Sequence, residues 1–219
     1  MNWHDFWWDM VEKKTNTIMR KLTLMAAVVG MVLIGCTNPQ KEDQTMKEQT
    51  IIENILTRKS VRYFTGDTIS QAQVETLLRC AMAAPSAMNK QPWAFIVVTD
   101  PDLLARIGSE MPNTRCQNRP ACAIVPCGDL SKALESRPDF WINDVSAATE
   151  NLLLAAHAMG LGAVWTGIHP DPDRVAQLQA ILHLPEHIVP LCVVPVGVPA
   201  ESPAPKDKFT EENIHYNRW

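Results

Sequence analysis

The sequence predicts an α+β domain over residues 50–219, because two kinds of apolar pattern occur along this part of the chain. Short, nearly continuous apolar runs rich in branched residues are typical of buried strands. Apolar residues that recur every three or four positions are typical of helices. The strand-like runs lie at 93–98, 120–127, 163–168 and 188–196, and the helical patterns at 48–57, 70–84, 101–107, 143–160 and 171–183.

The composition fits a single globular domain that carries no strong overall charge. The chain has 219 residues, of which 46% are hydrophobic and 20% charged, so it can form a substantial core and is not disordered throughout. Its net charge of −4 argues against a general nucleic-acid binder, which would show a basic excess. A local basic cluster in this chain therefore requires a local anion.

Residues 19–36 have the pattern of a lipoprotein signal peptide. Met19 to Lys21 is positively charged, Leu22 to Ile34 is apolar, and Leu33 to Cys36 resembles a lipobox, in which Cys36 would carry the lipid. The apolar part is too short to span the roughly 30 Å hydrocarbon core of a membrane as a helix. We expect a membrane-anchored lipoprotein, periplasmic or on the cell surface; the alternative, without a true signal, is a cytoplasmic protein.

Two further segments flank this leader. Residues 1–18 contain acids where a signal peptide has basic residues, so we interpret them as a non-native or mis-assigned extension and expect translation to start at Met19. Residues 37–49 are polar and predict a tether between the lipid and the domain.

Start and stop signals fix several elements of the domain. Ser70 and Gln73 form the pattern of a capping box, so a helix begins there and ends before Pro85. Trp93 then opens a buried strand. Pro126 lies in the second strand, where it predicts an edge position or a bulge, because proline gives no backbone donor to a sheet.

The helix predicted over Asn143 to Gly160 is apolar nearly all round, so it must be buried in a core or an interface. His157 within it is expected to be a hydrogen-bonded core histidine rather than a catalyst. The following Gly160-Leu-Gly162 is not a dinucleotide site, because that motif follows a strand and opens a helix. The last strand, 188–196, is interrupted by Pro190 and Pro195.

No metal site is expected. Cys116, Cys122 and Cys127 lack C-x-x-C spacing, and Pro185 prevents His183 and His187 from sharing a regular helix. Cys80, Cys122 and Cys192 lie in apolar runs and are interpreted as small core residues.

Two polar loops carry the candidate chemistry. Arg58, Lys59, Ser60 and Arg62 place three cations and a hydroxyl within five residues, which suits a phosphate, although a solvated basic face has the same pattern. Residues 85–91 form a small-residue turn that ends in amide side chains, which suits the edge of a flat heterocycle. An ordinary turn without a ligand has the same residue types.

The two loops together resemble the nitroreductase family of flavin mononucleotide (FMN) oxidoreductases. The family segments R-x-S-x-R-x-F and P-S-x-x-N-x-Q-P-W stand here at 58–64 and 85–93, and the resemblance extends over residues 50–219. It implies a mixed, mainly antiparallel sheet flanked by helices, in a domain-swapped homodimer with two FMN sites at the interface. It also implies that a C-terminal arm, 199–219, brings lysines close to the FMN phosphate.

The resemblance implies a set of FMN-binding residues and no catalytic side chain, because the flavin itself carries the hydride. The set consists of Arg58, Lys59, Ser60, Arg62, Pro85, Ser86, Ala87, Asn89, Gln91, Trp165, Thr166, Gly167, Lys206 and Lys208.

The family's usual reaction is ping-pong reduction of a nitroaromatic or quinone-like acceptor. Its cytosolic members take electrons from NAD(P)H, which conflicts with the export that Cys36 predicts. Two alternatives therefore stay open: a membrane-tethered FMN-binding electron carrier without its own small-molecule substrate, and a dehalogenase or flavin-fragmenting enzyme whose lid residues the sequence does not identify.

Overall fold

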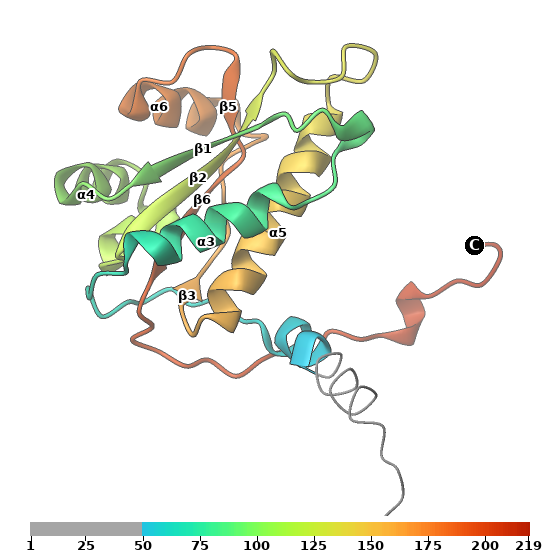
Figure 1. Ribbon diagram of the computed structural model, residues 1–219, viewed down its shortest axis with the longest axis horizontal. Helices are drawn as coiled ribbons and strands as arrows, with labels where there is room; N and C mark the ends of the chain where they lie inside the picture. Colours follow the sequence, from blue (N-terminus) through green and yellow to red (C-terminus); the bar gives the residue numbers. More distant parts are fainter. Residues whose placement is uncertain (1–49) are drawn as a thin grey trace, which may run out of the picture. The chain divides into compact units, whose positions relative to one another are not determined.

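The computed structural model describes residues 50–219, and the predicted leader, tether and Cys36 lie outside the described residues. Six strands form an antiparallel sheet in the order β1-β2-β6-β3, while β4 also pairs with β6 and β5 with β2 (Figure 1). The strands are β1 (Trp93–Val98), β2 (Cys122–Asp129), β3 (Gly162–Ala163), β4 (Thr166–Gly167), β5 (Ile188–Pro190) and β6 (Cys192–Gly197). The predicted α+β class is confirmed, and every strand pair within the described residues is antiparallel.

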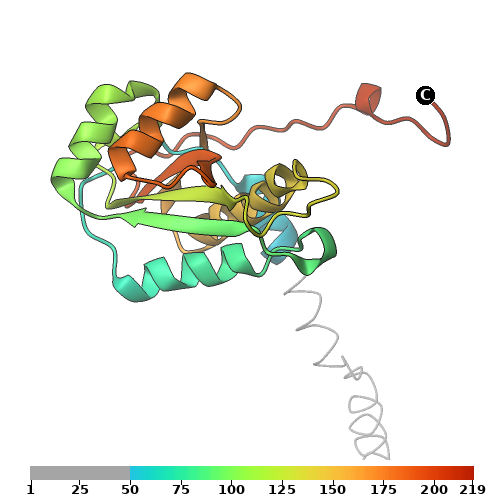
Figure 2. The same cartoon turned by 90° about the horizontal axis from the view of Figure 1, so that it is seen from above.

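Helices cover both faces of the sheet (Figure 2). They are α3 (Gln71–Met82), α4 (Pro101–Glu110), α5 (Phe140–Ala158) and α6 (Pro172–Leu182), with short 3-10 turns η1 (Ala87–Asn89), η2 (Pro112–Thr114), η3 (Cys116–Asn118) and η4 (Glu211–Asn213). Residues 50–57 are also helical. None of the helices in the described part of the chain has the length and apolar content needed to cross a membrane.

The helix starts follow from their capping residues. The predicted capping box is confirmed, because the Ser70 hydroxyl accepts from the Gln73 backbone N–H at 3.2 Å and the Gln73 side chain accepts from the Ser70 N–H at 2.8 Å. Asp100 and Asp171 cap α4 and α6 with carboxylates that accept from backbone N–H groups of the first turn, and each is followed by a proline at the first helical position.

Strand residues alternate between two cores. In β2, Cys122 and Ile124 pack with α3 and α5, whereas Ala123, Val125 and Cys127 pack with α4 and α6. This period of two is the geometry of a pleated strand buried on both faces. The strand β1 lies at the edge of the described sheet, so its end residues are buried and its four inner residues only partly; the prediction of a buried strand holds only in part.

Prolines interrupt the ladder where the neighbouring strand is also broken. Pro126 lies opposite Leu191, the residue between β5 and β6, and the register of β2 shifts by one residue between its pairs with those strands. This shift is a bulge, so the predicted edge position is wrong and the predicted bulge is right. Pro195 lies opposite the gap between β3 and β4, so the predicted strand 163–168 forms two short strands.

The cysteines of the described residues are free thiols that mostly fill the core. Burial raises the pKa of Cys116 and of Cys122 to about 11, and that of Cys127 to about 12. Cys122 and Cys192 are fully buried, as predicted, whereas Cys80 is only half-buried.

Much of the apolar surface of α5 is covered by its own chain. Leu152 and Leu153 are buried in the core that the sheet and α3 form, with Leu153 only 4% exposed. Of the two predicted settings for this helix, a core or an interface, the core is therefore the one that this face has. A group of exposed apolar side chains lies on the helix at 50–57, where Ile51, Ile52, Ile55 and Leu56 are between 53% and 69% exposed.

A candidate cofactor site

Residues 58–62, the basic loop, are held between strand β3 and the start of the C-terminal arm. The Val61 N–H donates to the Ala163 carbonyl at 3.0 Å, and the Arg62 N–H donates to Oε1 of Glu201 at 2.6 Å. Just beyond, Phe64 and Pro199 form an isolated bridge. The conformation of the basic loop is thus set by contacts to residues about 100 and 140 positions further along the chain.

The structure brings the basic loop and two lysines of the C-terminal arm around one cavity of about 250 Å³, the phosphate cavity. It is lined by Arg58, Lys59, Ser60, Arg62, Pro203, Ala204, Lys206 and Lys208. All six residues predicted to contact a phosphate are among them. Residues from both ends of the domain thus form one basic site.

The charges around this cavity are only partly compensated. Arg58 places its Nε 3.2 Å from Oε1 of Glu150, and its side chain is 17% exposed, while Lys59 donates to the Ser202 hydroxyl at 3.0 Å. Within residues 50–219, Arg62, Lys206 and Lys208 have no ion pair. A guanidinium has five N–H donors, so Arg58 keeps free donors beside its contact with Glu150, and the cavity suits an anion with several oxygens.

Residues 85–91, the Pro85 loop, have a backbone that other side chains hold in place. The Ala87 N–H donates to Oδ1 of buried Asp144 at 2.9 Å, and the Gln91 N–H donates to the Ser86 hydroxyl at 2.9 Å. Met88, Asn89 and Gln91 have φ angles of 51°, 54° and 50°, which are uncommon outside glycine. Such residues persist where the surroundings fix them, often at functional sites.

The Pro85 loop does not share the phosphate cavity. It lines a separate cavity of about 320 Å³, together with Phe140, Asn143, Asp144 and Ala147 of α5. The amide groups expected to face a heterocycle contact each other, because Gln91 Nε2 donates to Asn89 Oδ1 at 3.0 Å. Within one chain, the predicted cofactor residues therefore form separate groups.

Trp165, Thr166 and Gly167 line a third cavity of about 290 Å³, together with Arg62, Asn113, Arg115, Val164 and Arg174. The Thr166 hydroxyl is directed inward and donates to the Val193 carbonyl at 2.6 Å, so its side chain serves the fold. Arg62 lines both this cavity and the phosphate cavity, so the two are neighbours.

His157 is hydrogen-bonded, as predicted, with Nε2 3.1 Å from the Thr57 hydroxyl, but it is half-buried at the surface rather than in the core. Burial lowers its pKa, and the nearby cations Lys59 and Arg58 lower it further. His157 lines an apolar groove of about 650 Å³, which lies between the helix at 50–57, the end of α3, and α5. None of these contacts marks His157 as a catalyst.

Sequence reasoning missed three acids that position these loops: Asp144, Glu150 and Glu201. Asp144 and Glu150 are the acidic residues of a helix that is otherwise nearly apolar, and that contrast was the available signal. Glu201 gave no such signal in the sequence, because it lies in a charged, proline-rich segment.

Comparison with known proteins defines the class. The family model described as "Nitroreductase family" matches residues 55–114 and 113–198. A protein of Methanothermobacter thermautotrophicus with the name "Putative NADH dehydrogenase/NAD(P)H nitroreductase" is 39% identical over 177 residues, which cover 81% of this chain and 92% of that protein. This chain belongs to the nitroreductase family.

Solved structures agree with this assignment. A crystal structure from Parabacteroides distasonis, whose protein has the same name, superimposes with a TM-score of 0.73 at 44% identity, covering 78% of this chain and 99% of that one. The NADPH:FMN oxidoreductase of Vibrio harveyi, solved in complex with NAD+, has a TM-score of 0.69 at 27% identity, and the match covers 77% of each chain.

Proposed function

We propose that this protein is an FMN-dependent oxidoreductase that passes electrons from NAD(P)H to a small nitroaromatic or quinone-like acceptor in a ping-pong reaction. The observation that carries the proposal is the phosphate cavity, in which cations from both ends of the domain converge. Family membership and the Vibrio harveyi oxidoreductase, whose name includes NADPH and FMN, support the same choice of cofactor and donor.

The residues of the phosphate cavity fit the terminal phosphate of FMN. Arg58, oriented by Glu150, keeps N–H groups for the phosphate oxygens, and Ser60 adds a hydroxyl. Lys206 and Lys208 complete the positive charge from the opposite side. The bound flavin would supply the hydride chemistry, while the chain supplies binding, orientation and charge.

We propose further that the complete site requires a homodimer. The Pro85 loop is built and fixed, yet it lines a cavity of its own, and the apolar groove beside the helix at 50–57 leaves large side chains exposed. A second copy with the C-terminal arm reaching across, as in a domain-swapped homodimer, would cover the groove and bring a Pro85 loop to each basic loop.

The test of the cofactor is direct. The purified protein should release FMN on acid treatment, identified by chromatography, and the reduced protein should be reoxidised quickly by a nitroaromatic or quinone. Recovery of FAD, or of no flavin after incubation with excess FMN, would overturn the proposal.

The leader at 19–36 favours one alternative, a membrane-tethered FMN carrier, because a lipid-anchored protein outside the cytoplasm does not meet NAD(P)H. Fast reoxidation by a partner protein combined with slow reoxidation by every small acceptor would favour the carrier. The anchor itself has a separate test: wild-type protein should incorporate labelled fatty acid, and Cys36→Ser should not. Label retained in the variant would remove the lipoprotein assignment.

A further inference from the structure

The third cavity, beside Trp165, Thr166 and Gly167, is lined by three arginines from distant segments. Arg62 comes from the basic loop, Arg115 from the turn between η2 and η3, and Arg174 from the first turn of α6. No acidic residue lines this cavity of about 290 Å³, which we call the arginine cavity. Three like charges around one cavity repel each other unless an anion lies between them.

Two acids of the adjoining segments accept hydrogen bonds from backbone N–H groups. Asp171 accepts from the backbone N–H groups of Asp173 and Arg174, and Glu201 accepts from the backbone N–H of Arg62. In the described residues, none of the three arginines forms an ion pair with a carboxylate. Their side-chain charges are therefore left for a ligand.

Local structure works against an arginine at two of these positions. Arg115 has a φ angle of 63°, a left-handed conformation that side chains other than Asn, Asp and Gly rarely adopt. Arg174 places a cation in the first turn of a helix, where the backbone dipole favours anions. Both side chains are half-buried, so neither is an ordinary solvated arginine. A ligand that needs positive charge accounts for both.

We infer that Arg115 and Arg174 form an anion-binding subsite that selects substrates carrying a carboxylate or phosphate group. The inference rests on the proposed function and deepens it. Arg62, Trp165, Thr166 and Gly167 are assigned to the cofactor, whereas Arg115 and Arg174 line only the arginine cavity and belong to no cofactor residue set. A ligand held by these two arginines lies next to the cofactor site, where a reacting substrate must be. The planar fork of arginine suits both anions.

The first arm of the test compares acceptors of similar shape and different charge. Full-length wild-type, Arg115→Gln and Arg174→Gln proteins are assayed with 4-nitrobenzoate and with neutral 4-nitrobenzyl alcohol, at saturating donor. Losing one charge-assisted contact should raise the KM for 4-nitrobenzoate by roughly ten-fold or more. The KM for the neutral acceptor and both kcat values should change by less than about two-fold.

The second arm distinguishes the source of the anion, because the phosphates of a nicotinamide dinucleotide offer the same chemistry. NADH and NADPH are compared with the neutral donor 1-benzyl-1,4-dihydronicotinamide. If the subsite holds donor phosphates, the variants should raise the KM for NADH and NADPH but not for the neutral donor. Their KM values for the two acceptors should then stay as in the wild type. Either selective result supports the subsite and identifies which substrate it serves.

A binding measurement complements the kinetics. Titration calorimetry of the full-length protein with benzoate should show weaker binding in both variants, and benzamide should bind all three proteins equally weakly. Arg115→Lys and Arg174→Lys should keep part of the benzoate affinity that the glutamine variants lose, because lysine keeps the charge but not the planar fork of arginine.

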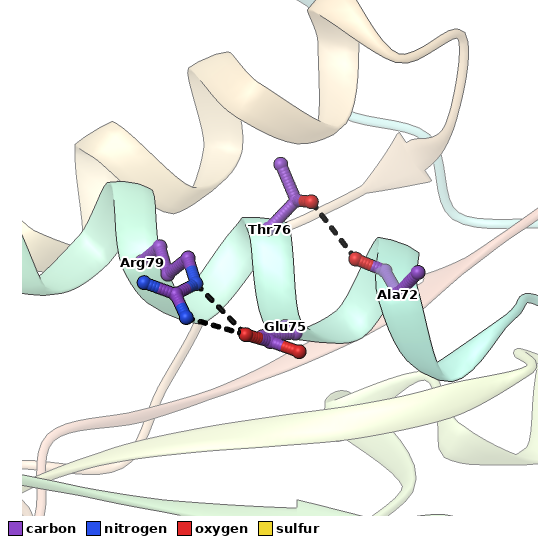
Figure 3. A network of polar contacts seen from close by, with 4 residues as sticks. All are labelled: Ala72, Glu75, Thr76 and Arg79. Carbon is purple, nitrogen blue, oxygen red and sulfur yellow. Dashed lines mark hydrogen bonds and ion pairs between the residues drawn. The ribbon is translucent and has the colours of Figure 1, made fainter.

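Arg79→Gln is the matched control. Arg79 lies on the exposed face of α3 and donates two hydrogen bonds to Glu75 (Figure 3), and it lines none of the cavities described above. It should leave every parameter unchanged. Equal effects on charged and neutral substrates, or no effect in Arg115→Gln and Arg174→Gln, would overturn the subsite while leaving the proposed function intact. A wild-type protein without flavin or turnover would overturn the proposed function, and the subsite with it.

Discussion

The basic loop and the Pro85 loop differ in how much of a binding site one chain completes. Both have backbones fixed by acids, Glu201 for the former and Asp144 for the latter. The basic loop also meets Lys206 and Lys208 around a shared cavity, whereas the Pro85 loop faces only α5 of its own chain. One chain therefore builds the basic half of the proposed FMN site by itself, whereas the proposed heterocycle half depends on what approaches the Pro85 loop.

The C-terminal arm gives the largest test of this comparison. A chain ending at Ser202 keeps the Glu201 contact to the basic loop and the contacts of residues 198–200 with residues 63–65, but loses both lysines. We expect it to fold with little change in Tm and to lose its flavin and its dimer. A chain ending at Val198 should lose stability as well, because the Glu201 contact and the Phe64 bridge disappear.

The measurements are flavin content, mass by light scattering and thermal unfolding. A Ser202-terminated monomer that still holds stoichiometric FMN would show that the site is complete within one chain, and the homodimer proposal would have to be given up.

The apolar helix at 50–57 tests whether a second chain is needed to complete the site, because it would lie in the proposed dimer interface. Ile55 is 53% exposed and lines the apolar groove, so Ile55→Asp should leave the chain folded. It should weaken association of the two chains by more than about a hundred-fold, because both chains of a symmetric dimer lose this apolar contact. The control is Leu153→Ala, which removes a buried core side chain and should lower the free energy of unfolding by about 2–5 kcal/mol. Sedimentation that shows the Ile55→Asp protein still dimeric would place the interface elsewhere.

A substitution of Arg58 tests only the phosphate cavity, without changing the Pro85 loop. Arg58→Ala should weaken FMN binding by roughly ten- to 150-fold, the range for a hydrogen bond to a charged group. Lys90, in the Pro85 loop, is exposed and lines none of the cavities described above, so Lys90→Ala serves as the control and should change affinity by less than about two-fold. Flavin titration measures both, and equal dissociation constants would remove Arg58 from the phosphate site.

The sequence predicted those features of the fold that depend only on residues close together in the chain. Ser70 and Gln73 specify a helix start because their mutual hydrogen bonds need only neighbouring residues, and the apolar run from Trp93 specifies a strand. It could not predict that Trp93 opens an edge strand, because pairing order depends on distant segments. The resemblance predicted that Arg58 and Lys206 lie at one phosphate site, and the two residues line the same cavity. The carboxylates that fix the loops come from positions whose role appears only when α5 and the arm are packed.

Asp144 tests the packing of the Pro85 loop. It is buried and accepts the Ala87 N–H, so Asp144→Ala leaves that donor unpaired and should cost about 1–3 kcal/mol in the free energy of unfolding. Asp144→Asn keeps an acceptor oxygen and should cost less. Denaturant unfolding measures both variants, and equal losses would mean that the charge of Asp144, rather than its hydrogen bond to the loop, stabilises this region.

Glu150 gives the smallest and most discriminating test, because its two contributions to the anion site oppose each other. Its carboxylate orients Arg58 through a 3.2 Å contact, and its negative charge also lies close to where a phosphate would bind. The pair is partly exposed, since Glu150 is 49% exposed, so its interaction energy is at most about 1 kcal/mol. Glu150→Gln keeps an acceptor oxygen for Arg58 and removes the competing charge, so FMN should bind more tightly, by up to about five-fold.

Glu150→Ala should have the opposite sign, because Arg58 then loses its orienting partner and must be ordered when the phosphate binds. Flavin titration at low ionic strength measures both changes, and the gain in Glu150→Gln should shrink as salt screens the charge. If both variants weaken FMN binding equally, the charge of Glu150 has no influence on the phosphate and the acid acts only by holding Arg58 in position.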